Sequence, residues 1–269
     1  MQFVAASKLR RAQESTLAAR PYSELVDEML ADLAGVLGGE EHPLLGRREG
    51  GMRLIILITS DRGLAGPLNT NAVRFASKEI IEHVGDLEMV TVGRKGRDAM
   101  RRARVPIIAH FAGFGDRPTV DDILPLARLI SDEYEAGTYN DVDIVFTRFV
   151  STLVQRADMV QLLPIRPSAD TEPGASGARL GGVPGSQFIF EPEPEVVLNE
   201  LLPRYLATRL YQTALESTAS FFSSQMVAMK NATENANELI DDLTLSYNKA
   251  RQANITSELI EIASGAQAR

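Results

Sequence analysis

The C-terminal quarter of the sequence constrains the fold more than any other part. From about Asn199 to Ser264 there is no glycine, and the only proline, Pro203, lies near the start. Glu, Leu, Ala, Gln, Lys and Met are frequent, and these residues lose little rotamer freedom in a helix. As one helix, these roughly 60 residues would extend about 90 Å at ~1.5 Å per residue. We therefore predict a single long helix over residues 195–264, which Gly265 can end.

The apolar pattern of this helix predicts a narrow contact surface. Residues 217–220 and 230–238 are small or polar on every side. Further along, apolar residues recur at spacings of three to five and form one stripe: Leu239, Leu243, Tyr247, Ala250, Ile255, Leu259 and Ile262. A helix with so thin a stripe needs a partner, but only a slender one.

The N-terminal segment is a candidate for that partner. No helix breaker occurs between Met1 and Arg20, and Gly35, Gly38 and Gly39 follow. Five apolar residues step by four and three in a heptad pattern: Tyr22, Val26, Met29, Leu33 and Val36. The pattern fits a helix over residues 1–37 in any bundle, or one strand of an antiparallel coiled coil with the C-terminal helix.

Charge is segregated along the first helix. Its first part carries four bases, Lys8, Arg10, Arg11 and Arg20, against the single acid Glu14. The far end of the C-terminal helix carries Lys249 and Arg251. A charge run is usually a solvated face. If the two helices pair antiparallel, however, we expect these bases to approach Met1–Arg11 and to form a cationic tip for an acidic partner.

Residues 52–190 have the alternating pattern of an α/β domain. We predict strands at 53–59, 87–92, 105–111, 142–149 and 153–163, the last two antiparallel, and a final strand at Phe188–Phe190. Helices are predicted from residue 69 or 70 to 83, at 98–103 and at 119–136, where Thr119-x-x-Asp122 is a good helix start, close to a capping box. This alternation predicts a mainly parallel, Rossmann-like sheet with right-handed crossovers. Residues 171–186 are rich in Gly, Ala and Pro and predict a flexible loop.

Composition excludes several functional classes. The chain has 269 residues and no cysteine, so disulfides and cysteine-ligated zinc are excluded. Its longest aliphatic run, at 54–58, is far too short to cross a bilayer, and no leader pattern opens the sequence. A formal charge of -8 argues against general nucleic-acid binding.

Candidate catalytic chemistry is weak. The loop Ser60–Asn69 has glycines near a helix start but lacks the Walker lysine and the Gly-x-Gly-x-x-Gly pattern, so a structural turn is favoured over a phosphate site. The turn Gly93–Arg97 is basic enough to bind an anion, but an exposed turn is the favoured interpretation there too. His42, His83 and His110 have no metal-ligand spacing. We therefore predict no catalytic residue, no cofactor and no metal.

Four blocks resemble the gamma subunit family of F-type ATP synthases, and the bacterial type most closely. They are Met1-Gln-Phe-Val-Ala-Ala-Ser-Lys-Leu-Arg10, the loop Ser60–Asn69, Met226-Val-Ala-Met-Lys230 and Tyr247-Asn-Lys-Ala-Arg-Gln-Ala-Asn-Ile-Thr256 with Glu258. They occur in the family's order across nearly the whole chain. A stand-alone α/β enzyme or nucleotide-binding protein using Ser60–Asn69 remains the alternative, and a generic coiled-coil scaffold is a third.

The resemblance implies a non-catalytic rotor shaft. In that family the terminal helices form an antiparallel coiled coil whose tip lies inside the ring of alpha and beta subunits. The α/β domain lies at the base, with the epsilon subunit and the ring of membrane c subunits. Nucleotide is bound by alpha and beta. The implied location is the cytoplasmic side of the bacterial inner membrane, reached only through the complex.

The resemblance also assigns candidate contact residues. Arg251, Gln252, Thr256 and Glu258 match the motif near the catalytic collar, with Met1 expected to pack near them, and Lys8, Arg10 and Arg11 match the basic segment suited to an acidic loop of beta. Phe188, Phe190 and Glu191 fall near the family's c-ring foot.

The chain departs from the family pattern at its start, because it opens inside the family's first helix. A late-assigned start codon, a cut chain and a shortened shaft remain open. A truly short first helix would leave the apolar stripe of the upper C-terminal helix exposed. In the loop, Ala65 and Pro67 stand where the family usually has Cys and Gly.

Overall fold

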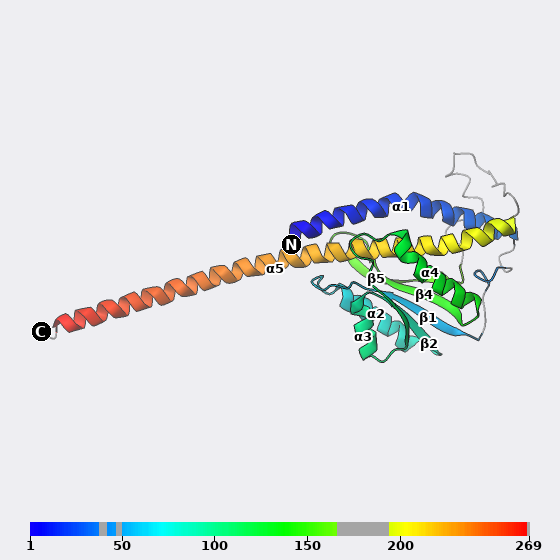
Figure 1. Cartoon of the computed structure of the whole chain (residues 1–269). Helices are drawn as coiled ribbons and strands as arrows, with labels where there is room; N and C mark the ends of the chain where they lie inside the picture. Colours follow the sequence, from blue (N-terminus) through cyan, green and yellow to red (C-terminus); the bar gives the residue numbers. More distant parts are fainter. Residues whose placement is uncertain (38–41, 47–49, 166–193, 268–269) are drawn as a thin grey trace.

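Two helices of very different length form the long axis of the molecule (Figure 1). The computed structural model describes residues 1–37, 42–46, 50–165 and 194–267. Helix α1 spans Gln2–Leu37 and helix α5 spans Pro194–Gln267, which is 74 residues. At ~1.5 Å per residue α5 is about 110 Å long. The predicted long helix is therefore confirmed as one element that contains Pro203, but the predicted stop at Gly265 is wrong, because the helix continues to Gln267.

A five-stranded sheet lies beside the first half of α5 (Figure 1). The strands are β1 Met52–Ile58, β2 Leu87–Val92, β3 Ile107–Phe111, β4 Tyr139–Phe149 and β5 Gln155–Leu163, in the order β3-β2-β1-β4-β5. The first four are parallel and β5 pairs antiparallel with β4, as the sequence predicts. The predicted strand at Phe188–Phe190 and the predicted flexible loop at 171–186 lie outside the described residues.

The alternation of apolar side chains places helices on both faces of the sheet. Ile55, Leu57 and Met89 pack with helices α2, Leu68–Glu82, and α3, Arg94–Arg102. Leu54, Ile56 and neighbours on the opposite face pack with α4, Val120–Glu135, and with the first part of α5. Because successive residues of a strand point to opposite faces, each strand serves both layers.

Local sequence signals locate most element ends to within two residues; β4 is one exception, since it begins at Tyr139 and not at residue 142. At the start of α4, the Thr119 side chain accepts a hydrogen bond from the Asp122 N–H, and the Asp122 carboxylate accepts from the Thr119 N–H, so the predicted capping box is confirmed. Strand β2 has the predicted bounds. The prediction for α3 is wrong at its start, because the helix begins at Arg94 and not at residue 98.

Helices α1 and α5 run antiparallel, but only along the first half of α5 (Figure 1). Leu9 and Ala12 of α1 share a buried cluster with Ala219 and Phe222 of α5. Beyond residue 229, every α5 residue whose burial is described, through residue 262, is exposed. The apolar stripe is among them, with Leu243 60% and Leu259 60% exposed. The fold is thus a partial antiparallel coiled coil attached to a Rossmann-like domain.

The antiparallel pairing does not bring the two basic groups together, so the predicted cationic tip is wrong. Lys8 lies over the ring of Phe222, at 5.4 Å from its centroid. Lys249 therefore lies 27 residues, or about 40 Å at ~1.5 Å per residue, beyond the part of α5 that contacts Lys8. The sequence pattern predicted the direction of pairing correctly but not its register.

Candidate functional site

Three serines fasten α5 to the carboxyl edge of the sheet. Ser220 Oγ donates a hydrogen bond to the Thr147 carbonyl at 2.9 Å, and Ser223 Oγ donates to the Thr152 carbonyl at 2.7 Å. Ser224 Oγ donates to the Ala65 carbonyl at 2.6 Å. These carbonyls belong to the end of β4, the turn after it, and the loop between β1 and α2. We call this arrangement the serine joint.

The serine joint explains the run of small residues that the sequence shows in the middle of the long helix. Ser220 and Ser223 are fully buried, and their short side chains let the helix approach the strand ends closely. Large side chains here would hold the sheet away from the helix. The signal was visible in the sequence as serines without an apolar stripe, but their acceptors lie about 70 to 160 residues away in the chain.

The opposite side of the same helical turns holds α1. Phe222 is 1% exposed and packs against Leu9 and Ala12, while its ring contacts Phe221 edge to face at 5.3 Å between centroids. Lys8 lies over the Phe222 ring and also forms an ion pair with Asp116, in the loop between β3 and α4. Helix α1, helix α5 and the sheet therefore meet at one level of the long axis.

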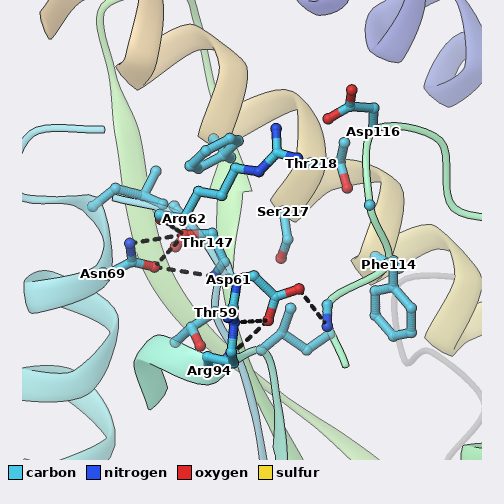
Figure 2. A pocket seen from close by; sticks show the side chains of 17 residues that line it. Thr59, Asp61, Arg62, Asn69, Arg94, Phe114, Asp116, Thr147, Ser217 and Thr218 are labelled. Atoms are coloured by element: carbon cyan, nitrogen blue, oxygen red, sulfur yellow. Dashed lines mark hydrogen bonds and ion pairs between the residues drawn. The ribbon is translucent and has the colours of Figure 1, made fainter. Parts of the chain in front are cut away.

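The loop Ser60–Asn69 closes this junction from the sheet side. Asn69 Oδ1 accepts a hydrogen bond from the Ser60 N–H at 3.1 Å, and Asn69 Nδ2 donates to Ser60 Oγ at 2.8 Å (Figure 2). The loop includes Gly66, whose φ is +52°, a left-handed conformation that glycine adopts without strain. The loop is thus held at both ends by its own side chains, and Ser224 binds its middle.

Asp61 supplies the missing cap of α3. Its carboxylate accepts hydrogen bonds from the Arg94 N–H at 2.9 Å and from the Gly113 N–H at 3.0 Å (Figure 2). Helix α3 has no side-chain cap of its own at Gly93, so a carboxylate from a distant loop occupies the position where an anion would bind. This tertiary cap explains why the local sequence did not predict the true start of α3.

Gly96 allows the close contact between α3 and β1. A Cβ atom added at Gly96 would lie 2.8 Å from Thr59 Oγ1, and the Gly96 N–H donates to this same oxygen at 2.8 Å. The basic turn Gly93–Arg97 is therefore a helix start packed onto the sheet. This packing accounts for its glycines without a bound anion.

A cavity of about 360 Å³ lies at the centre of the junction, between the strand ends and α5 (Figure 2). Its wall includes Asp61 and Asp116 together with Arg62 and Arg94. Phosphate would have to displace the Asp61 carboxylate from the N-terminus of α3 and lie near Asp116. The cavity therefore has the position of a ligand site in an α/β sheet, but its charges do not favour a nucleotide.

The collar residues predicted on α5 lie on its exposed half. Arg251, Gln252, Thr256 and Glu258 are all exposed. Thr256 Oγ1 donates to the Gln252 carbonyl at 2.8 Å, a bond within the helix itself. The described residues offer these side chains no contact from another element, so they are available to a partner.

The collar residues predicted on α1 lie in a second group. Met1 is 84% exposed, and the Arg10 side chain, 83% exposed, pairs with Glu14 on the same helix. Arg11 is exposed, whereas Lys8 is held by Asp116 and is only 28% exposed. The N-terminus lies beside the middle of α5 and far from the C-terminal end of that helix, so Met1 does not pack near Arg251 as expected (Figure 1).

The remaining predictions concern the foot residues, metal ligands and membrane spans. The foot residues Phe188, Phe190 and Glu191 fall outside the described residues. Among the described side chains, no cluster of three or more His, Asp or Glu residues could ligate a metal ion. None of the described helices combines the length and the apolarity that a bilayer span requires.

Comparison with known proteins gives the family. The model of the ATP synthase family described as "ATP synthase" matches residues 1–268. The chain is 45% identical over 270 residues to an ATP synthase gamma chain of Dehalococcoides mccartyi, covering all of this chain and 91% of the relative. It is 42% identical over 268 residues to one of Pelotomaculum thermopropionicum, with the same coverage.

Solved structures agree with the fold. A chain of the Tetrahymena thermophila mitochondrial ATP synthase central stalk and c-ring structure superposes with a TM-score of 0.63 at 24% identity, covering 87% of this chain and 97% of that one. A chain from the Euglena gracilis mitochondrial ATP synthase OSCP/F1/c-ring structure gives a TM-score of 0.61 at 18% identity, covering 98% and 95%. From the full-length family match and the close relatives, the chain belongs to the ATP synthase gamma chain family.

Proposed function

We propose that the chain is the central-stalk rotor of a bacterial F-type proton-translocating ATP synthase, which couples rotation of the c-ring to conformational change at the alpha and beta sites. As a gamma chain it is a subunit of the enzyme and not its catalytic subunit. The observation that carries the proposal is α5. From residue 230 to residue 262, about 48 Å at ~1.5 Å per residue, it continues as one helix in which every residue is exposed.

The geometry suits a shaft that is rigid at its base and projects at its tip. The serine joint, the Phe222 contacts and the Lys8–Asp116 ion pair join two helices and a sheet at one level. A turning force applied to the domain is therefore transmitted to α5. Rotation of an asymmetric shaft changes which surface each catalytic subunit meets. A shaft can bias a site only by contacting its conformations differently.

Two groups of residues are proposed to contact the alpha and beta subunits. The upper group is Arg251, Gln252, Thr256 and Glu258, and the lower group is Met1, Arg10, Arg11 and Lys8. Their separation along α5 supports two levels of contact and not one collar. Lys8 is only 28% exposed and is held by Asp116, whereas the Arg10 side chain is 83% exposed and Arg11 is exposed too, so Arg10 and Arg11 are the bases best suited to an acidic loop of beta.

The base of the chain is proposed to meet the epsilon subunit and the c-ring through the segment that includes Phe188, Phe190 and Glu191. The chain would then lie on the cytoplasmic side of the bacterial inner membrane and reach the membrane only through the complex. The solved chains that it resembles come from structures described as central stalk, rotor, F1 and c-ring, which supports membership of such a complex.

Assembly is the direct test of the rotor proposal. A tagged chain expressed in a strain that lacks its own gamma subunit should co-purify with alpha, beta and epsilon. Replacing Leu243, Leu259 and Ile262 together by Ser should reduce recovery of alpha and beta, because these side chains are exposed on the projecting half of α5. The control Ile81→Ser, at an exposed residue of α2, should leave recovery unchanged. A tagged chain that recovers none of the three subunits would refute the proposal.

The alternative, a nucleotide-binding protein using Ser60–Asn69, has a separate test. Calorimetric titration of the isolated chain with ATP, ADP and phosphate should show no tight binding, because Asp61 already occupies the helix terminus. Micromolar binding that disappears in Asn69→Ala would favour that alternative over the rotor.

The lower contact group has its own test in membranes. Arg10→Ala with Arg11→Ala should weaken the coupling of ATP hydrolysis to proton pumping without unfolding the chain, since both side chains are exposed. Adding Lys8→Ala should lower stability as well. Unchanged ATP synthesis in the triple variant would remove the assigned role.

A further inference from the structure

Helix α3 and the adjacent edge of the sheet form a basic surface to which the proposed rotor contacts assign no role. Six bases and a single acid lie between Arg94 and Arg104, in a chain whose formal charge is -8. Four of the six are exposed and make no ion pair with any described residue: Lys95, Arg101, Arg102 and Arg104. The remaining two pair weakly or locally, Arg94 with Asp61 at 3.7 Å and Arg97 with its neighbour Asp98 at 2.9 Å.

This surface contains a groove that runs beside a strand. The groove has a volume of about 420 Å³ and is lined by Arg97, Arg101 and Arg104 on the helix side. Its other side is formed by residues 105 and 107–110, which lie in and before β3. The groove therefore combines cations with a strand backbone.

Strand β3 is an edge strand in the described part of the sheet. It pairs with β2 on one side, and no described strand lies on its other side. An edge strand presents backbone N–H and C=O groups to which another extended segment can bond. Ile108, within β3, is 40% exposed and adds an apolar contact beside the cations.

From these observations we propose that the α3–β3 edge binds an extended acidic segment of another polypeptide, which adds as a strand to β3. Main-chain hydrogen bonds to β3 would supply affinity, and alternate carboxylates would reach Arg97, Arg101 and Arg104. The charge selects an acidic partner over a basic one, and the strand edge selects a peptide over a lipid surface. The inference does not depend on the rotor proposal, because β3 lies at the sheet edge opposite β5 and away from the serine joint.

In the competing interpretation, the basic side chains protect the edge strand from pairing with other copies of the chain. Charged side chains beside an edge strand also discourage pairing between identical sheets. In that case the arginines repel other copies of this chain and bind no acidic segment. Both interpretations predict that the surface is basic, so the test must measure binding.

Fluorescence anisotropy with three labelled octapeptides separates these interpretations. The full chain should bind alternating Glu-Val peptide at micromolar concentration, and should bind alternating Lys-Val peptide at least tenfold more weakly. An alternating Glu-Pro peptide keeps the charge but loses half of its backbone donors, so it should also bind at least tenfold more weakly.

Matched variants localise the site. Arg101→Gln with Arg104→Gln should weaken Glu-Val binding about tenfold or more. The control Arg74→Gln with Arg156→Gln removes two exposed arginines from α2 and β5 and should leave binding unchanged. No Glu-Val binding at millimolar concentration, equal binding of the Glu-Pro peptide, or insensitivity to Arg101 and Arg104 would each overturn the proposal. So would binding to phosphatidylglycerol vesicles with no peptide binding.

Discussion

The two halves of α5 are one helix in two different environments. Residues 196–229 pack against α1, α4 and the sheet, and this half includes fully buried residues such as Leu202, Leu210 and Phe222. Residues 230–262 are exposed throughout, including Leu239 and Tyr247. The first half is stabilised by tertiary packing, whereas the second depends on intrinsic helix propensity and on local pairs such as Lys230–Glu234.

The comparison separates the part of α5 that is stabilised by contacts with other elements from the part that is not. An isolated helix is only marginally stable in water, and most helical stability in proteins comes from packing of an amphipathic face. The exposed half lacks Gly and Pro, but Asn, Asp, Ser and Thr supply 12 of its 33 residues, so neither strong propensity nor packing stabilises the helix there. Its exposed apolar stripe is then the feature that a partner would bury.

Hydrogen exchange should show the largest contrast. Amides of residues 200–225 are expected to exchange only through near-global unfolding, which typically requires about 5–15 kcal/mol. Amides of residues 235–262 should open with little cost, giving rates at least about a thousandfold faster. Exchange measured by mass spectrometry on the isolated chain tests this. Equal protection of the two halves would mean that the exposed half is stabilised by self-association, and a dilution series would reveal it.

The same Leu→Ala substitution should lower the free energy of unfolding by very different amounts in the two halves of α5. Leu210→Ala removes a side chain that is 1% exposed, and should lower the free energy of unfolding by about 2–5 kcal/mol. Leu243→Ala, at a residue 60% exposed, should change it by less than about 0.5 kcal/mol. Urea denaturation followed by circular dichroism measures both. A large cost for Leu243→Ala in the isolated chain would contradict the exposure of the upper half.

The same contrast explains what the sequence could predict. Elements whose signals are local were predicted well, as at β2 and at the Thr119 cap, because the residues that determine them are adjacent. The start of α3 was missed because its cap is Asp61, 33 residues earlier in the chain. The serine joint was seen only as unusual composition, since its acceptors belong to distant loops.

The register between α1 and α5 is the feature of the fold that the sequence predicts least well. The stripes on the two terminal helices predict that they pair, but a short stripe can pair anywhere along a longer one. The structure pairs Leu9 with the Ala219–Phe222 level, which separates Met1 from Arg251. At this register Lys8 pairs with Asp116 in the loop after β3, and Ser220 at the same level of α5 bonds to the Thr147 carbonyl of β4, so the register involves contacts outside the two helices. A pattern confined to the two helices therefore could not reveal it.

The serine joint should contribute less to the free energy of unfolding than the apolar core does. Ser220→Ala removes the hydrogen bond to the Thr147 carbonyl and should cost about 0.5–1.5 kcal/mol in unfolding free energy. Thr256→Ala is the matched control, because its hydroxyl bonds only to the Gln252 carbonyl of its own helix, and should change stability by less than about 0.5 kcal/mol. Thermal and urea unfolding measure both. Equal effects would mean that the joint does not fasten the lower half of α5 to the sheet.

The smallest effect is expected at the ion pair between Lys8 and Asp116, whose side chains are 28% and 48% exposed. Because water screens exposed charges, their coupling should be about 0.2–1 kcal/mol. A double-mutant cycle with Lys8→Ala, Asp116→Asn and the double variant measures this coupling directly. The same variants also distinguish two possible roles of Lys8, which are holding α1 to the sheet and contacting a partner subunit. If Asp116→Asn impairs ATP synthesis as much as Lys8→Ala does, Lys8 acts by holding α1 to the sheet. If only Lys8→Ala impairs it, the ammonium group contacts a partner subunit, and the lower level of the shaft binds beta through three bases instead of two.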